Sequence, residues 1–467
     1  MGIKQKIAQY RAYKEGVMHC TFNPSGPGVV RIHLIPPRFR LFGNSSYIII
    51  LNGYYLLPIG YSWALLLRCF IEEVNRFDGK PLGDGDMEGI AERTVARVHR
   101  LYGGVHPSLL HRDLMTILDI LFDIADGVEC DAELQKLSIR AYVKRMTAPH
   151  RMDLMVRAMT DEGGRWQCNQ KCLFCYAAGQ SYAKVRELST AEWKTAIDRL
   201  RVAGVPMVTF TGGEPTQRED LSELVAHARW FVTRLNTNGV MLTEELASKL
   251  KEADLDSVQI TLYSSDAEIH NALVGSAHFS DTVSGIENAV RAGLDVSVNT
   301  PLCRKNADYL ETLRFLHEKG VRFVTVSGLI CTGTAGINHA EYDLSKDELT
   351  EIVRSARAFC DAHEMEIDFT SPGLIDEAVL ESLGMNVPMC GAALSNMAIA
   401  PDGTVVPCQS WLGTDAGLGN ILADPFRKIW EHKTCRALRK MSREEALSCP
   451  FRKSKKQEGD GDGKKKA

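Results

Sequence analysis

The chain has 467 residues, of which 45% are hydrophobic and 24% are charged, and its formal net charge is −4. This composition is typical of a globular protein with room for roughly two to four domains. The small net charge argues against a general nucleic-acid or membrane-surface binder, because such proteins concentrate charge of one sign. The 13 cysteines are an odd number, and we expect no signal peptide. We therefore expect reduced thiols in a cytoplasmic setting.

Residues 1–130 are expected to form a small α+β module. The apolar run over residues 47–71 is long enough to span a membrane, but glycine, proline and asparagine residues break it into short pieces. We therefore predict a β-hairpin followed by a helix in this run. Apolar residues at helical spacing predict two further helices, over 87–103 and 108–127.

Residues 150–335 alternate short β-rich runs with amphipathic helical runs. Several of the helical runs start at Ser, Thr or Asn and end at Gly, as helix caps prefer. Strands joined by helical crossovers form a parallel sheet with right-handed connections. A complete barrel needs eight such units, so we predict an α/β fold with an open, partial (β/α)6 TIM-like barrel. The six predicted strands lie within residues 153–159, 205–213, 233–239, 256–264, 295–302 and 322–329.

A third region is expected over residues 345–450. It begins with helical runs around a short strand over 365–370. The sequence Pro-Asp-Gly at 401–403 separates two apolar runs and predicts a hairpin. The tail over 452–467 has no apolar residue before its final alanine, and we predict that it is disordered.

Three cysteines follow the first strand of the predicted barrel: Cys168, Cys172 and Cys175. Thiolates are good ligands for zinc and iron. A structural zinc site usually takes four ligands in two pairs, and the sequence has no second CxxC pair. Histidine or aspartate could complete a zinc site, so zinc stays open as an alternative. A cubane iron–sulfur cluster fits better, because three cysteines leave one iron with an open position, as in catalytic metal sites.

Polar or small residues follow the later strands. Gly212 and Gly213 lack side chains, so their backbone can approach a ligand closely. Glu214, which follows them, could receive an ammonium group. The runs over 236–239 and 260–265 add polar groups at two further strand ends. The carboxyl ends of parallel strands are where α/β folds place their active sites.

The combination resembles the radical S-adenosylmethionine (SAM) superfamily. The resemblance rests on CxxxCxxC with an aromatic residue at Phe174, on Gly-Gly-Glu-Pro at 212–215 and on Thr-Asn-Gly at 237–239, and it covers residues 150–330. It implies that the three cysteines hold a [4Fe-4S] cluster whose open iron is chelated by SAM. An external one-electron reductant would then allow SAM cleavage to a 5′-deoxyadenosyl radical, which abstracts a hydrogen from the substrate.

The same resemblance assigns residues to SAM binding. Gly212, Gly213 and Glu214 would meet the methionine amino group. Thr261 and Tyr263 would lie near the ribose or carboxylate, although this chain has TLYS where SLDG is commoner. Asn299 and Ser327 are further candidates at the fifth and sixth strand ends, where ordinary strand-end polar residues are the alternative.

The C-terminal cysteines resemble the opening half of a SPASM domain. Cys390 and Cys408 form C-x12-G-x4-C, and Cys435 and Cys449 remain before the charged tail. The resemblance implies at most one auxiliary iron–sulfur cluster from these four, as in the shortened twitch version. A metal-free remnant, a zinc site and a purely helical role for Cys435 stay open. Cys69, Cys303, Cys331 and Cys360 are expected to be small buried hydrophobes.

SPASM-bearing members of the superfamily mostly modify peptides, and many carry a winged-helix-like recognition element that takes the leader peptide as an added strand. Residues 40–130 fit the size and order of that element. We therefore expect a peptide maturase whose partner is a peptide with a leader segment, with no nucleic acid and no membrane involved. The type of modification stays open. The alternatives are maturation of a protein side chain as in sulfatase activation, a small-molecule radical enzyme, and an inert peptide-binding scaffold.

Overall fold

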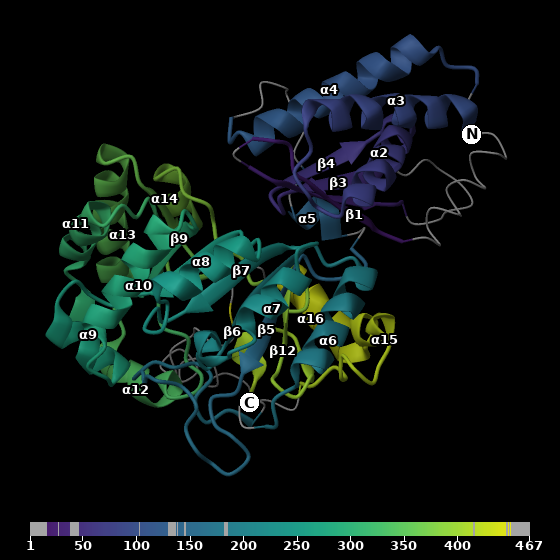
Figure 1. Ribbon diagram of the computed structural model, residues 1–467. Coiled ribbons are helices and arrows are strands. Elements are labelled where there is room, and N and C mark those ends of the chain that lie inside the picture. Colours follow the sequence, from purple (N-terminus) through teal and green to yellow (C-terminus); the bar gives the residue numbers. More distant parts are fainter. Residues whose placement is uncertain are drawn as a thin grey trace, which may run out of the picture. The chain divides into compact units, whose positions relative to one another are not determined.

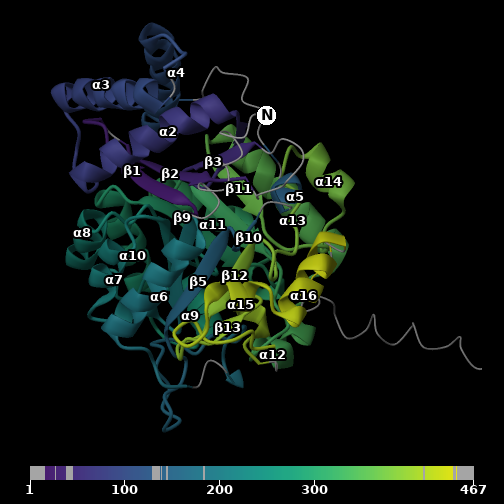
Figure 2. The same ribbon diagram turned by 90° about the vertical axis from the view of Figure 1, so that its right-hand side faces the viewer.

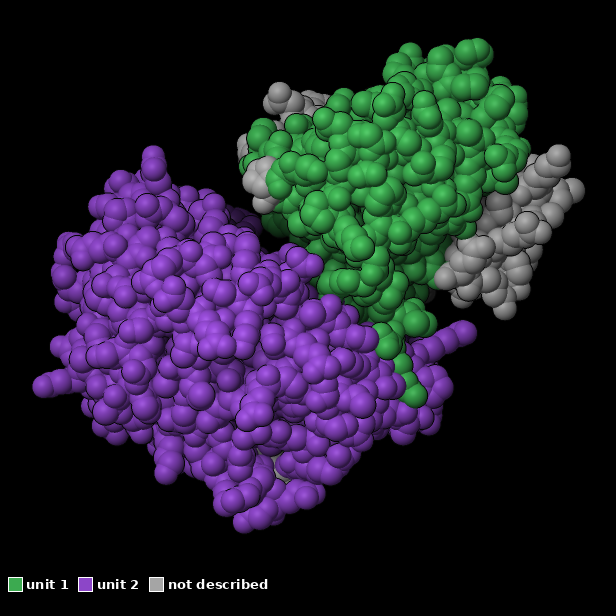
Figure 3. Space-filling model, in the orientation of Figure 1, with its two compact units in different colours: residues 1–150, 198–207, 229–232 green, residues 151–197, 208–228, 233–467 purple. Residues whose placement is uncertain are grey.

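A computed structural model describes residues 16–26, 28–37, 46–101, 103–128, 137, 139–143, 146–181, 185–413, 416–444, 447 and 449. The structure divides into two compact units, which Figure 3 colours separately. Unit 1 comprises residues 1–150, 198–207 and 229–232, and unit 2 comprises residues 151–197, 208–228 and 233–467. The predicted disordered tail over 452–467 lies outside the described residues.

Unit 1 contains an antiparallel sheet with the strand order β1-β2-β3-β4. The predicted hairpin is confirmed as β3 and β4, and its turn places Asn52 and Gly53 at positive φ, which these residue types adopt most readily. Helices α2, α3 and α4 lie on one face of the sheet (Figures 1 and 2). The elements are β1 (Met18–Phe22), β2 (Val30–Ile35), β3 (Tyr47–Leu51), β4 (Tyr55–Ile59), α2 (Tyr61–Val74), η1 (Asn75–Phe77), α3 (Asp84–Leu101), α4 (Pro107–Ala125) and α5 (Ile139–Tyr142).

The first two strands of unit 1 were not predicted. Strand β2 is buried along its whole length, yet it includes Arg31 and His33. Arg31 is accommodated because its Nε donates a hydrogen bond to the backbone oxygen of Phe231 at 3.2 Å. The apolar run over 47–71 is divided between β3, β4 and α2. No helix among the described residues is long and apolar enough to cross a membrane.

Within the described part of the chain, the main sheet has nine strands in the order β11-β10-β9-β8-β7-β6-β5-β12-β13. Its six central strands are the predicted ones, and the pairs β7–β8, β8–β9 and β9–β10 are parallel. Strands β5 and β10 are not neighbours, so the barrel is open, which confirms the predicted fold class. These strands are β5 (Arg151–Arg157), β6 (Met207–Gly212), β7 (Val232–Thr237), β8 (Ser257–Thr261), β9 (Asp295–Pro301) and β10 (Phe323–Ser327).

Helical crossovers connect the barrel strands. Helix caps fix their ends: the Thr243 hydroxyl accepts a hydrogen bond from Leu246 N at the start of α8, and Gly275 ends α9 in the left-handed conformation. The helices are α6 (Thr190–Ala203), α7 (Leu221–His227), α8 (Glu244–Glu252), α9 (Ala267–Val274), α10 (Phe279–Arg291) and α11 (Tyr309–Glu318), with short 3-10 turns η4 (Pro215–Gln217) and η5 (Arg304–Asn306).

One face of the barrel sheet is polar. Along β7, β8 and β9, fully buried residues alternate with half-buried ones. Successive side chains of a strand point to opposite faces, so the half-buried set shares one face and the buried set, which is mostly apolar with a few threonines, lies on the other. The half-buried residues include Arg234, Asn236, Gln259, Thr261, Ser297 and Asn299. The sheet thus keeps an accessible polar face, which an enzyme can use to bind a ligand.

The C-terminal region extends the barrel sheet at both edges. The predicted strand over 365–370 is β11, which pairs in parallel with β10. The predicted hairpin is β12 and β13, and β12 pairs in parallel with β5. Its turn has Gly403 at φ +87°. The region contains α12 (Ala335–Tyr342), α13 (Lys346–Ala362), β11 (Glu366–Phe369), α14 (Glu377–Ser382), β12 (Asn396–Ile399), β13 (Val405–Val406), η6 (Gln409–Trp411), α15 (Phe426–Trp430) and α16 (Lys433–Glu444).

Candidate active site

The three cysteines predicted as cluster ligands lie on one loop after β5, which we call the cluster loop (residues 168–176). Backbone hydrogen bonds fasten this loop to the end of α9: Lys171 N donates to Val274 O and Leu173 N to Leu273 O, each at 2.9 Å. Gly275 lies directly behind the loop, because a Cβ there would meet Lys171 O at 2.5 Å. These contacts fasten one side of the loop to the barrel.

The segment after β10 fastens the other side of the cluster loop. Thr334 donates from its backbone N to Cys175 O at 3.0 Å, and its hydroxyl bonds to the carbonyls of Cys172 and Cys175 at 3.2 Å each. Asn338 donates its side-chain amide to Leu173 O at 2.9 Å. Gly333 has φ +59°, and a Cβ there would lie 2.3 Å from Cys175 O. These roles could not be predicted from the sequence, because they depend on chain segments that meet only in the fold.

The three thiols are chemically suited to a metal cluster. Burial raises the pKa of Cys168 to about 12, and burial also raises the pKa of Cys172 and Cys175. Neighbouring thiolates and the Glu214 carboxylate raise the pKa of Cys168 and Cys172 further. Without a cation nearby, buried thiols resist ionisation. Once a cation compensates the negative charge, the same thiols ionise and become strong ligands. The donor set therefore fits an iron–sulfur cluster.

The spacing of the triad weighs against a single zinc ion. Tetrahedral zinc, with Zn–S bonds of about 2.3 Å, places its sulfurs roughly 3.8 Å apart. The sulfurs of Cys168, Cys172 and Cys175 do not all lie within 4.8 Å of one another. Among the described residues, the group of ligand atoms that meets this limit is Cys331, His339 and Asp343. The triad sulfurs are thus spread more widely than one zinc ion requires.

The two glycines at the end of β6 are required by packing against β5. Gly212 has φ +140°, and a Cβ there would lie 2.3 Å from Arg157 O. A Cβ on Gly213 would lie 2.8 Å from Ala158 O. The sequence predicted that a ligand approaches these glycines. The described contact is with the backbone of the neighbouring strand, which brings the strand end beside the residues that precede the cluster loop, and the approach of a ligand stays a prediction.

Glu214 links the ends of β6 and β7. Its Oε1 accepts hydrogen bonds from Thr216 N (3.0 Å), from the Thr216 hydroxyl (2.6 Å) and from the Thr237 hydroxyl (2.5 Å). Its Oε2 accepts from Asn238 N at 2.8 Å. The side chain is buried, and this burial raises the pKa of its carboxyl group, against the effect of the hydrogen bonds. Both oxygens are thus engaged by the protein at the site where an ammonium group was expected.

The residues predicted at the later strand ends separate into two environments. Thr261 and Asn299 are register partners on β8 and β9 and belong to the half-buried polar face. Asn299 Oδ1 accepts a hydrogen bond from the Thr325 hydroxyl at 2.9 Å. Tyr263 is instead buried in an apolar cluster with Phe174 of the cluster loop, at 6.4 Å between ring centroids, and burial raises its pKa well above the usual value. Ser327 is also buried at the end of β10.

The C-terminal cysteines divide into a group and a separate residue. Cys449 and Cys390 both act electrostatically on Cys408, although burial is the main reason that the pKa of Cys408 rises to about 12. Cys435 is fully buried on α16, where its electrostatic neighbours are Arg439 and Glu431. Cys408 thus has Cys390 and Cys449 among its electrostatic neighbours, whereas Cys435 has none of the other three predicted auxiliary ligands among its own.

The C-terminal region packs beside the cluster loop. The Tyr176 hydroxyl, next to Cys175, donates to Gln409 Oε1, next to Cys408. Met155, Ala177, Ala398 and Val406 belong to one apolar cluster against which Cys168 and Cys175 pack. The segments that carry the two cysteine sets are therefore joined by a hydrogen bond, and the cluster loop packs on residues of β12 and β13.

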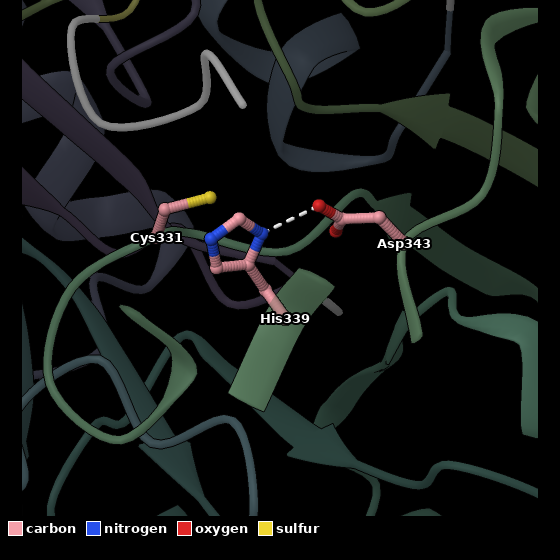
Figure 4. A group of neighbouring side chains, drawn as sticks. All are labelled: Cys331, His339 and Asp343. Atoms are coloured by element: carbon pink, nitrogen blue, oxygen red, sulfur yellow. Dashed lines mark hydrogen bonds and ion pairs between the residues drawn. The ribbon is translucent and has the colours of Figure 1, made fainter. Parts of the chain in front are cut away.

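The remaining cysteines follow the prediction with one exception. Cys69, Cys303 and Cys360 are buried among apolar residues, as expected. Cys331 is only half-buried, and it lies beside His339 and Asp343 (Figure 4). The prediction that Cys331 is a small buried hydrophobe is therefore wrong, because the loop after β10 turns it towards polar residues of the α12 region.

Comparisons with known proteins agree with this architecture. The profile of the radical SAM superfamily matches residues 167–316, and that of the SPASM iron–sulfur cluster-binding domain matches residues 390–450. The mycofactocin maturase MftC of Mycolicibacterium smegmatis is 30% identical over 278 residues, which are 57% of this chain and 68% of that protein.

Two solved structures share the fold. Streptococcus suis SuiB bound to its precursor peptide SuiA has a TM-score of 0.57 at 15% identity, covering 84% of this chain and 87% of that one. The protein anSMEcpe with bound AdoMet has a TM-score of 0.51 at 20% identity, covering 63% of this chain and 80% of that one. The radical SAM domain implies a [4Fe-4S] cluster and SAM, and the SPASM domain implies auxiliary iron–sulfur chemistry. This chain belongs to the radical SAM superfamily and is a radical SAM enzyme with a SPASM domain.

Proposed function

We propose that this enzyme matures a ribosomally made peptide by abstracting a hydrogen atom from it. One observation carries the proposal. The structure brings the loop with Cys168, Cys172 and Cys175 together with Glu214 and Asn238, at the carboxyl ends of the first three barrel strands. The similarity to a mycofactocin maturase and to the fold of a protein solved with its precursor peptide supports a peptide substrate.

The chain's own groups would perform distinct tasks. Cys168, Cys172 and Cys175 would hold the [4Fe-4S] cluster through three thiolates and leave one iron for SAM. When bound, the cluster and SAM supply a 5′-deoxyadenosyl radical. The backbone of residues 212–214 would lie near the methionine part of SAM, and Thr261 and Asn299 would offer hydrogen bonds on the polar face of the sheet.

Two aromatic rings would protect this chemistry from water. Tyr263 and Phe174 are buried in one apolar cluster that also includes Leu273 and packs against Cys172. A dry environment on this side of the cluster loop would restrict side reactions of a reactive intermediate. We assign Tyr263 to this packing role, because its ring belongs to the apolar cluster and not to the polar face.

Unit 1 would recognise the leader segment of the peptide. Among the described residues, it is an antiparallel sheet with β1 and β4 at its edges, followed by three long helices. Leu137 N already donates a hydrogen bond to Leu56 O of β4, so β1 is the edge that we assign to the peptide. Addition of a peptide strand to a sheet edge provides affinity through backbone hydrogen bonds, and side-chain pockets provide specificity. The order of unit 1, strands first and then helices, supports this proposal.

Cys390, Cys408 and Cys449 would hold one auxiliary cluster. Cys390 and Cys449 are electrostatic neighbours of Cys408, and the SPASM profile covers all three, which supports this assignment. The hydrogen bond from Tyr176 to Gln409 would couple this second site to the cluster loop. An auxiliary cluster at this position could exchange electrons with the substrate or anchor the peptide.

The experiment uses the full-length, anaerobically prepared enzyme with SAM, dithionite and candidate precursor peptides from the native host. We expect one peptide to bind at micromolar affinity or better and to change mass in a SAM-dependent reaction. A matched reaction with Cys172→Ala should leave the peptide unchanged while the peptide still binds. An enzyme that cleaves SAM but binds and changes no peptide would redirect the proposal to a protein or small-molecule substrate.

A further inference from the structure

Cys331, His339 and Asp343 form a group that the radical chemistry does not use. Each side chain offers one ligand atom, and these sulfur, nitrogen and oxygen atoms all lie within 4.8 Å of one another (Figure 4). His339 is on α12, and Asp343 follows it by one helical turn at the end of that helix. Cys331 lies in the loop that leads into the helix. The local chain therefore folds three different donor types towards one point.

The contact between His339 and Asp343 is close. His339 Nδ1 and Asp343 Oδ2 are 2.5 Å apart. The His339 side chain is 7% exposed and that of Asp343 is 32% exposed. A thiolate and a carboxylate together carry two negative charges, which a divalent cation neutralises. Sulfur, imidazole and carboxylate are also the three donor types that zinc accepts in proteins.

A proton relay would need a different geometry. In a thiol–imidazole–carboxylate relay, the carboxylate and the thiol lie on opposite sides of the imidazole. The sulfur and the carboxylate oxygen are then roughly 7 Å or more apart, because the ring and two hydrogen bonds of about 3 Å lie between them. Here the Cys331 sulfur and an Asp343 oxygen lie within 4.8 Å. The donors converge, as the ligands of a single ion do.

We propose that Cys331, His339 and Asp343 bind one Zn²⁺ ion, separate from the iron–sulfur sites. Tetrahedral zinc separates its donors by roughly 3.3–3.8 Å, so the group needs only a small adjustment to bind it. Three protein ligands leave a fourth position for water or a substrate group.

The ion would stabilise the segment that supports the cluster loop. The residues between Cys331 and Asp343 include Thr334 and Asn338, whose hydrogen bonds hold the carbonyls of the cluster loop. Zinc would fix both ends of this segment, from the start of the loop to the end of α12. The cluster loop would then open less often than in the zinc-free protein, because a ligand that binds only the closed state stabilises it.

The test measures zinc and iron in the full-length protein with its clusters intact, after dialysis against micromolar Zn²⁺. We expect one zinc per chain in the wild type. Cys331→Ser and His339→Gln should weaken zinc binding at least about 100-fold with iron content unchanged, and Asp343→Asn by about 10–100-fold. Cys360→Ser, a buried cysteine on α13 outside the group, is the matched control and should bind zinc as the wild type does.

A second readout uses Co²⁺ and amide hydrogen exchange. Cobalt in the site should give a thiolate-to-cobalt absorption band that Cys331→Ser abolishes and Cys360→Ser retains. Zinc should slow exchange in the cluster loop of the wild type but not of His339→Gln. A wild type that binds no zinc at micromolar concentration overturns the proposal. A Cys331→Ser protein that keeps its full zinc and its cobalt band also overturns it.

Discussion

Asn238 donates its side-chain amide to Asn169 Oδ1 at 2.6 Å, and this bond ties the end of β7 to the cluster loop next to Cys168. The backbone N of the same asparagine donates to Glu214 Oε2. One residue of the Thr-Asn-Gly run thus connects the two other motifs. The contact explains why short motifs on three separate strands form one site.

Asn238→Asp should weaken this connection without changing the size of the side chain. Aspartate still accepts the hydrogen bond from Val240 N, but it cannot donate to Asn169 Oδ1. The substitution removes one hydrogen bond and places two acceptor oxygens opposite each other, which destabilises the arrangement of the site by about 1–3 kcal/mol. Because the arrangement of these residues is needed for SAM binding, we expect SAM to bind about tenfold more weakly in equilibrium dialysis. The control is Asn271→Asp, because Asn271 Oδ1 accepts from Phe279 N, a role that aspartate retains. Equal losses in both variants would exclude a specific role for Asn238.

Gly333→Ala should displace the segment that supports the cluster loop. The added Cβ would lie 2.3 Å from Cys175 O and 2.6 Å from Tyr176 O. We expect slower cluster assembly and at least a twofold loss of iron per chain after reconstitution. Gly293→Ala is the matched control, since Gly293 also has positive φ, at +69°, but has no atom within 4 Å of its added Cβ. Iron content that falls equally in both variants would show that backbone strain alone is responsible.

The auxiliary site should depend on Cys408 and not on Cys435. Cys408 is the residue on which Cys390 and Cys449 act, whereas Cys435 has Arg439 and Glu431 as its electrostatic neighbours. We expect Cys408→Ala to lose the iron and the absorbance of one cluster and Cys435→Ala to keep both. Iron analysis and Mössbauer spectroscopy would measure this. Loss of iron in Cys435→Ala with a folded protein would add Cys435 to the ligands.

Unit 1 should lose stability in acid through His19. Burial is the main reason that the pKa of His19 falls to about 4. The hydrogen bond from His19 Nε2 to the backbone oxygen of Arg201 raises this pKa, whereas the positive charge of the Arg201 side chain lowers it. The unfolded histidine has a pKa near 6.5, so between pH 6.5 and 4 the unfolded state binds the extra proton. The neutral His19 therefore contributes about 3 kcal/mol to the free energy of unfolding above pH 6.5, and this contribution is lost as the pH falls towards 4.

Urea denaturation at several pH values tests this dependence. His19→Gln stays neutral and can still donate to Arg201 O, so its stability should fall less than that of the wild type below pH 6.5. His33 lies beside His19, with ring centroids 4.9 Å apart, and its pKa is also lowered well below the usual value by burial, with His19, His150 and Arg31 contributing. The stability of His19→Gln should therefore still depend on pH in part, through His33. Parallel curves for wild type and variant would contradict the assignment to His19.

The barrel was predictable because its strands are short β-rich runs that alternate with amphipathic helical runs and have turn residues between them. The extension of the sheet was not, since β12 pairs with β5 through contacts between segments that are distant in sequence. Strand β2 was missed because its buried Arg31 and His33 break the apolar pattern. Their burial is stabilised by tertiary contacts that local sequence does not encode, such as the bond from Arg31 to Phe231 O.

In the candidate site, too, the local features could be predicted from the sequence and the contacts between distant segments could not. The cysteine spacing predicted the cluster loop, since local chain geometry determines where those side chains lie. The partners of Glu214 were not predictable, because Thr237 and Asn238 come from the next strand. His339 and Asp343 are one helical turn apart, so their proximity could be predicted from the sequence. The approach of Cys331 to them could not, because it depends on the fold of the loop before α12.

Hydrogen transfer from the peptide tests the central claim most directly. The full-length enzyme would react with SAM, dithionite and a deuterated precursor peptide, and mass spectrometry would follow 5′-deoxyadenosine and the peptide. We expect deuterium in 5′-deoxyadenosine together with a modified peptide in the wild type, and neither product with Cys172→Ala. Modification of the peptide by Cys172→Ala, or 5′-deoxyadenosine that never contains deuterium while the peptide changes, would contradict it.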